Sequence, residues 1–142
     1  MSVSARNQLS GVVASVTEGA VNNEVVLTLE GGETLTTVIT RASSNTLGLV
    51  PGKAAIALVK APWVILASAN SGLVFSARNQ FRGKVTSVIP GAVNSTIHLV
   101  TGSGLALTST ITNESVAEMQ VGVGSELVAL IKASSVILAT KA

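Results

Sequence analysis

The sequence predicts an all-β protein made of two tandem copies of one small antiparallel module. The chain matches itself when it is shifted by 72 residues: residues 4–68 align with residues 76–140 without a gap, and 29 of the 65 aligned positions are identical. Each copy contains five short segments rich in Val, Leu, Ile and Thr, separated by Gly and Pro turn signals. We therefore expect two modules, over 4–68 and 76–140, joined by a linker over 69–75.

The strands follow from hydrophobic patterning and turn signals. In the first copy Val25, Leu27 and Leu29 fall on one face of an extended segment, as in a strand with one buried side. Gly31-Gly32 predicts a hairpin turn and Pro51-Gly52 a further turn. The expected strands of the first copy are residues 9–16, 24–30, 34–40, 53–60 and 63–67.

One short helix is expected between the third and fourth strands, over residues 43–49. At the same place in the second copy, Ser115 precedes Glu118 by three residues, which is the pattern of a capping box with a serine N-cap. Five short strands with one small helix after the third favour a compact antiparallel barrel of the OB type. We therefore expect two tandem OB-like five-stranded modules, each with one short helix.

The composition excludes several classes of site. Aromatic residues make up 2% of the chain, so the core must be built from aliphatic side chains. The chain has no Cys and no Asp, and His98 is its single histidine. A thiol nucleophile, a Ser-His-Asp triad and a thiolate metal site are therefore excluded. We expect no catalytic residues and no metal-cation site.

The composition also bears on partners and location. A net charge of +2 and the scarcity of aromatic residues argue against a nucleic-acid partner. The longest apolar runs fall far short of the roughly 20 residues that a membrane span needs. The first ten residues hold no apolar stretch of the kind found in signal peptides. We therefore expect a cytoplasmic protein with no membrane partner.

The polar residues that recur in both copies are the candidates for a binding site. Ser-Ala-Arg-Asn-Gln, Ile-Thr-x-x-Ser and a Lys-Ala, at residues 60–61 and 132–133, occur at equivalent positions in both copies. Arginine, lysine and hydroxyl groups are hydrogen-bond donors, and no carboxylate recurs with them, so the set suits an oxyanion and not a metal cation. Placed at helix N-termini, Ser43 and Ser115 would also favour an anion. Structural alternatives remain open: helix capping for these serines, protection of edge strands for Lys60 and Lys132, and solvation of strand ends for the arginines.

The same residues resemble a known family. S-A-R-N-Q near the start, G-A-V-N about fifteen residues later, I-T-x-x-S in the middle and L-V-K-A-P-W-V near the end of the first copy are similar to the molbindin, or molybdenum-pterin-binding protein (Mop), module. This module also occurs as the TOBE-type domain of molybdate-responsive regulators and transporter ATPases. The resemblance covers essentially the whole chain, which is similar to a di-domain molbindin.

The resemblance implies a fold, an assembly and a function. Each module would be an OB-like barrel, pairs of modules would exchange or share strands, and three di-domain chains would form a homotrimer. The chain would bind the small oxyanion molybdate, with tungstate as an analogue and no organic cofactor, for storage or homeostasis. Molybdate would lie at interfaces between modules and between subunits. The alternatives are a molybdate-sensing regulatory module that acts through a protein partner and, less favoured by composition, a nucleic-acid-binding OB protein.

The resemblance also assigns residues. The first copy would supply Ser4, Ala5 (backbone), Arg6, Thr40, Ser43, Lys60 and Ala61 (backbone). The second copy would supply Ser76, Ala77, Arg78, Thr112, Ser115, Lys132 and Ala133. Further sites near a threefold axis are expected at two turns whose backbone N–H groups can form an anion nest: Gly19, Ala20, Val21 and Asn22, and Gly91, Ala92, Val93 and Asn94. Because Pro62-Trp63 is replaced by Ser134-Ser135 in the second copy, the two sets need not bind with equal affinity.

Overall fold

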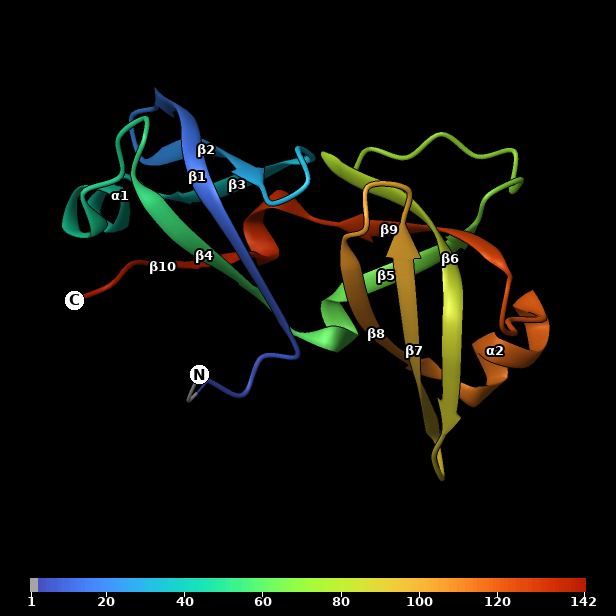
Figure 1. Cartoon of the computed structure of the whole chain (residues 1–142). Helices are drawn as coiled ribbons and strands as arrows, with labels where there is room; N and C mark the ends of the chain where they lie inside the picture. Colours follow the sequence, from blue (N-terminus) through green and yellow to red (C-terminus); the bar gives the residue numbers. More distant parts are fainter. Residues whose placement is uncertain (1–2) are drawn as a thin grey trace. The chain divides into compact units, whose positions relative to one another are not determined.

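The computed structural model describes residues 3–142 and consists mainly of antiparallel strands (Figure 1). The prediction of an all-β protein with one short helix in each repeat is confirmed. The first repeat contains β1 (Asn7–Glu18), β2 (Asn22–Leu29), β3 (Thr34–Thr40), α1 (Arg41–Leu47), β4 (Ala54–Val59), the 3-10 turn η1 (Ala61–Trp63) and β5 (Val64–Ser68). The second contains β6 (Asn79–Pro90), β7 (Asn94–Thr101), β8 (Ala106–Thr112), α2 (Asn113–Met119), β9 (Glu126–Ile131), η2 (Ala133–Ser135) and β10 (Ile137–Ala139).

The strands form two five-stranded antiparallel sheets, and the last strand of each repeat belongs to the sheet of the other. The strand orders are β10-β4-β1-β2-β3 and β5-β9-β6-β7-β8. The chain accordingly divides into a first unit, made of the residues up to Val59 together with Lys132–Ala142, and a second unit, Lys60–Ile131. The strand exchange that the resemblance implied is therefore present. The expected linker, residues 69–75, connects β5 to β6 within the second unit.

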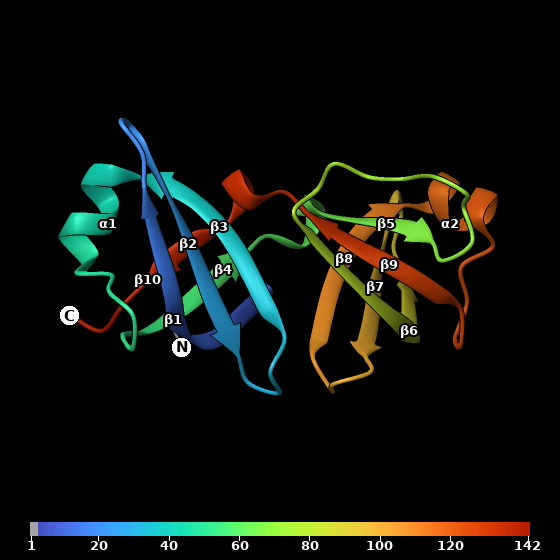
Figure 2. The same ribbon diagram turned by 90° about the horizontal axis from the view of Figure 1, so that it is seen from above.

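Each sheet is strongly curled (Figure 2), and the same local features bend both. The pairing of β1 with β2 shifts between Val13 and Ser15, and that of β6 with β7 between Val85 and Ser87. Such bulges bend a strand and increase its twist. A Cβ atom on Gly83 would lie 2.8 Å from the carbonyl oxygen of Val100. The backbones therefore approach too closely for any residue but glycine at this point of the curl.

The core is aliphatic apart from Phe81, and within residues 3–142 no buried side-chain nitrogen or oxygen lacks a hydrogen-bond partner. Leu27 and Leu35 in the first unit and Leu99 and Leu107 in the second are almost fully buried. The second sheet also has a side-chain bond between its two outer strands, because Ser109 Oγ in β8 donates to the carbonyl oxygen of Val64, 2.6 Å away, at the start of β5. This bond helps to close the curled sheet into an OB-like half-barrel.

The predicted helix start is wrong in both repeats. The helices begin at Arg41 and Asn113, and the N-caps are Thr40 and Thr112 instead of the serines. Each threonine ends a strand in an extended conformation, and its side-chain oxygen accepts the N–H of the residue three positions later. Ser115 therefore lies inside the first turn, and no capping box forms from it. The I-T-x-x-S motif itself could have indicated this start, because its threonine lies three residues before the serine whose N–H an N-cap side chain would accept.

Candidate functional site

The two Thr-x-x-Ser pairs have almost the same geometry in the two units. Thr40 Oγ1 accepts the Ser43 N–H at 3.1 Å and lies 2.8 Å from Ser43 Oγ, to which it donates. The corresponding distances for Thr112 and Ser115 are 3.1 and 2.9 Å. Because each serine oxygen accepts the threonine proton, its own O–H is directed toward an acceptor outside the pair. Each pair therefore presents one serine hydroxyl as an oriented donor.

In the first unit this pair lines a groove of about 610 Å³. The groove contains Thr40 and Ser43 from the end of β3 and α1, Asn22 from β2, and Ser134 from η2. Ser134 follows Ala133, so the Lys-Ala segment next to the first repeat's hydroxyl pair is that of the second repeat. The strand exchange thus brings the segment after Lys132-Ala133 to the hydroxyl pair of the first repeat. The Ser-Ala-Arg segment lies at the other end of β1 from this pair, because Asn7 pairs with Val59 whereas Glu18 at the far end forms an ion pair with Arg41.

The last two residues of S-A-R-N-Q hold the first three in place. Asn7 Nδ2 donates to the carbonyl oxygen of Val59 at 3.1 Å, and Asn79 makes the same bond to Ile131. Both asparagines are buried. Gln8 Nε2 donates to the Ala5 carbonyl oxygen at 3.1 Å. The equivalent glutamine in the second repeat makes the same kind of bond. Only the Ser, Ala and Arg of this motif were predicted as ligands, although Asn and Gln recur with them.

The candidate ligands of these segments lie at the surface or close to it. Ser4, Arg6, Ser76 and Arg78 are exposed, and the alanines between them are half-buried. Arg6 precedes Asn7, which pairs with Val59 across the β1–β4 ladder. Arg78 likewise precedes an asparagine that pairs at the end of β9. Both guanidinium groups therefore extend from the start of a well-paired strand whose first residue is anchored in the core.

The Lys-Ala segments differ between the repeats in what surrounds the lysine. Lys60 Nζ lies 5.9 Å from the centre of the Trp63 ring, a cation–π contact that restricts the side chain. Lys132 has Ser135 at the corresponding place. Both lysines are exposed, whereas the alanines that follow them are buried. The two lysine environments are therefore unequal, in line with the difference in sequence at Pro62-Trp63.

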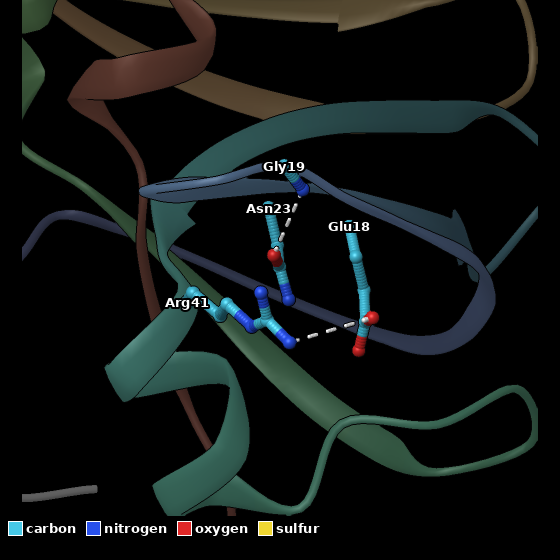
Figure 3. A network of polar contacts seen from close by, with 4 residues as sticks. All are labelled: Glu18, Gly19, Asn23 and Arg41. Carbon is cyan, nitrogen blue, oxygen red and sulfur yellow. Dashed lines mark hydrogen bonds and ion pairs between the residues drawn. The ribbon is translucent and has the colours of Figure 1, made fainter.

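The two turns expected to bind anions are partly bonded internally. The Gly91 N–H donates to the Asn94 carbonyl oxygen at 2.9 Å. The Gly19 N–H donates to Asn23 Oδ1 at 3.4 Å, and Figure 3 shows this bond beside the Glu18–Arg41 ion pair. The first N–H of each turn is thus engaged within the protein. An anion nest at residues 19–22 and 91–94 stays a prediction.

The charged groups of the described residues do not form a cation site. Among residues 3–142, no three His, Cys, Asp or Glu side chains gather closely enough to hold a metal ion. His98 is half-buried, and its Nδ1 lies 3.1 Å from Thr108 Oγ1. No helix within the same range has the length and apolar character needed to cross a bilayer.

The fold and the recurring donor sets define a tandem OB-like β-protein with surface groups suited to an anion. A family model described as the TOBE domain matches the chain twice, over residues 3–66 and 76–138. The chain belongs to the TOBE domain family.

Named relatives agree with this membership. The molybdenum-pterin-binding protein MopA of Rhodobacter capsulatus is 42% identical over 139 residues, which cover 98% of this chain and 52% of that protein. The molybdenum transport protein ModE of Herbaspirillum seropedicae is 36% identical over 141 residues, 99% of this chain and 52% of that protein. This chain thus spans about half the length of both. These relatives are named as molybdenum-binding and molybdenum-transport proteins, and none of these names denotes an enzyme.

A solved structure matches along the whole chain. It is a crystal structure of the cytoplasmic molybdate-binding protein ModG with molybdate bound, 45% identical to this chain. The TM-score is 0.95, and the match covers 99% of this chain and 100% of that one.

Proposed function

We propose that this protein binds molybdate in the cytoplasm, with tungstate as an analogue and no organic cofactor, and serves molybdate storage and homeostasis. The observation that carries the proposal is the donor set that recurs in both repeats, on a fold that matches molybdate-binding ModG over its whole length. The function is binding alone, because the recurring set contains no carboxylate, thiol or imidazole that could transfer a proton or attack a substrate.

The chemistry of the donors supports a tetrahedral dianion. The guanidinium groups of Arg6 and Arg78 each offer a planar fork of N–H groups, the ammonium groups of Lys60 and Lys132 supply compact charges, and the Ser43 and Ser115 hydroxyls add neutral donors. Of the two lysines, Lys60 lies over an aromatic ring. The arginine and lysine of one repeat together carry two positive charges, which balance the two charges of the anion and lower the cost of removing water from it.

The exposure of these donors supports sites at interfaces. An anion on an open surface keeps much of its hydration, so exposed donors gain little by binding it. A second copy of the chain placed over the donors would exclude water and add donors from the opposite side. We therefore place the complete sites where copies of the chain meet, in a homotrimer, and the proposal predicts that binding and assembly are linked.

A second function has one specific observation in its favour. The match to ModE covers 99% of this chain, and the related ModE of Escherichia coli is named a DNA-binding transcriptional dual regulator. On this alternative, the chain is a molybdate-sensing module that acts through a protein partner. Affinity purification from cells with and without molybdate separates the two functions. A partner retained only in one condition supports sensing, and the absence of any such partner supports storage.

The proposal is tested by calorimetric titration of the purified chain with molybdate, tungstate and sulfate, together with its mass in solution. A charge-assisted hydrogen bond contributes about 1.5–3 kcal/mol, so Arg6→Ala or Arg78→Ala should weaken binding at one set by about one to two decades. Arg82→Ala is the matched control, because Arg82 is exposed, does not recur in the other repeat, and donates to the backbone carbonyl oxygen of Ala69 at 3.2 Å. The control variant should bind like the unaltered protein.

Each result decides the proposal. Heat from molybdate and tungstate, with more than one ion per chain on a trimer, supports interface sites and a storage role. Absence of heat with all three ions rejects oxyanion binding. The recurring arginines and lysines would then have a structural role. Equal weakening by Arg6→Ala and Arg82→Ala would show that general positive charge, and not the assigned donor set, holds the anion.

A further inference from the structure

The two repeats join the same turn to the same helix start with different side chains. In the first repeat the Arg41 N–H donates to the carbonyl oxygen of Val21 at 2.8 Å, and in the second the Asn113 N–H donates to Val93 at 2.9 Å. Arg41 and Asn113 directly follow the N-cap threonines of the two hydroxyl pairs. Whatever holds these turns in place therefore also sets where the threonine and serine donors point.

The first repeat secures this junction with an exposed ion pair and a long hydrogen bond. Arg41 Nη2 lies 3.9 Å from Glu18 Oε2, and the two side chains are 50% and 61% exposed. Figure 3 shows the Arg41 side chain extending across the turn toward Glu18. A further link is the 3.4 Å bond from the Gly19 N–H to the buried side chain of Asn23. Salt screens an exposed pair of this kind, because the Debye length shrinks to about 3 Å at 1 M ionic strength.

The second repeat secures the same junction with neutral hydrogen bonds. Its sequence replaces the ion pair with Pro90 and Asn113. Asn113 Nδ2 donates to the Gly91 carbonyl oxygen at 2.9 Å, and Ser95 Oγ donates to Asn113 Oδ1 at 2.5 Å. Ser95 is 2% exposed. Short bonds between uncharged groups do not depend on ionic strength in the way that a surface ion pair does.

We infer that Arg41 and Asn113 are positioning residues for the two hydroxyl pairs, and that they give the two repeats different responses to ionic strength. The Thr40–Ser43 pair is held by a junction that loosens in high salt, and the Thr112–Ser115 pair by one that does not. The inference rests on the proposed function, since the donors concerned are the proposed molybdate ligands. The two anion sites of one chain would therefore differ in their response to ionic strength, although their ligand residues are identical.

The direct test is amide hydrogen exchange of the full chain without molybdate, in about 20 mM and about 1 M NaCl. We expect exchange in residues 19–23 and 41–47 to accelerate about 1.4- to 5-fold in high salt, the range that the loss of a surface ion pair predicts. Residues 91–95 and 113–119 should not change. Acceleration in both repeats, or in neither, overturns the inference.

Variants separate positioning from general stability. Arg41→Gln should abolish the salt response of the first repeat, whereas Arg82→Gln, an exposed arginine away from the junction, should leave it intact. Asn113→Ala should accelerate exchange at 91–95 in both salts. The double variant Arg41→Asn with Asn23→Ser gives the first repeat the bonding groups of the second and should make it independent of salt. Retention of the salt response in Arg41→Gln rejects the role of Arg41.

A titration with molybdate connects the junction to binding. In an Arg78→Ala background, which leaves the donor set of the first repeat intact, adding Arg41→Gln should weaken molybdate binding several-fold in low salt and leave it unchanged in high salt. Equal weakening in both salts overturns the inference. If the unaltered chain releases no heat with molybdate, the proposed function fails, and the exchange experiment still decides whether the two junctions differ.

Discussion

Leu138→Ala tests which unit the end of the chain completes. By sequence Leu138 belongs to the second repeat, but in the structure β10 pairs with β4, and Leu138 lies opposite Ala57 in the first unit. Its side chain is 7% exposed. Leu66 is the matching residue of the first repeat, lies opposite Ala129 in the second unit and is 8% exposed. The two substitutions should therefore weaken units opposite to the repeats in which they lie.

The size of the effect follows from the loss of a buried leucine. Leu→Ala in a core costs about 2–5 kcal/mol, and each 1.4 kcal/mol is a factor of ten in an opening equilibrium. Amides that exchange by opening of the whole unit should therefore exchange at least about 30-fold faster. Hydrogen exchange resolved by residue measures this. Leu138→Ala should accelerate amide exchange in β1 and β4 and leave it unchanged in β6 and β9. Leu66→Ala should have the reverse effect.

An exposed neighbour provides the control for this pair. Ile137 is in the same short strand but is 55% exposed, so Ile137→Ala should change exchange far less than Leu138→Ala. Acceleration of β6 and β9 by Leu138→Ala, with β1 and β4 unchanged, would show that each repeat completes its own sheet. Equal acceleration of both units would also contradict the assignment of Leu138 to one of them.

Two further changes test features that both repeats share. Gly83→Ala places a methyl group 2.8 Å from the Val100 carbonyl oxygen and should lower the free energy of unfolding, measured by thermal unfolding, by about 1–3 kcal/mol. Gly102→Ala is the control, because a methyl group there meets open space. An unchanged melting temperature in Gly83→Ala would contradict the close approach. Thr112→Ala removes the helix cap and should cost about 0.5–2 kcal/mol in urea unfolding. It should also release the Ser115 N–H to solvent, and unchanged exchange of that amide would show that the cap is unimportant.

The sequence alone determined the secondary-structure elements and the chemistry of the recurring polar groups. Alternation of aliphatic residues, glycine turns and the 72-residue repeat depend on local chemistry, so the strands and the single short helix of each repeat could be predicted from it. The donor types could be predicted for the same reason, because arginine, lysine and hydroxyl groups keep their chemistry in any fold. The predicted helix start was wrong because the N-cap is the threonine at the end of the preceding strand and not the serine. The extended backbone of this threonine lets its side-chain oxygen accept the N–H three residues later.

The tertiary structure decided which segments complete each unit. The same four residues occur at the fifth strands of both repeats, Val64–Ala67 and Val136–Ala139, so hydrophobic pattern alone would let either segment pair with either sheet. The choice depends on where the chain leads after β4 and β9, which no local pattern contains. As a result the segment that follows Lys132-Ala133 completes the first unit, because β10 pairs with β4. The same long-range pairing gives Asn7 and Asn79 their buried acceptors at the ends of β4 and β9, a role that appears only once these strands lie side by side.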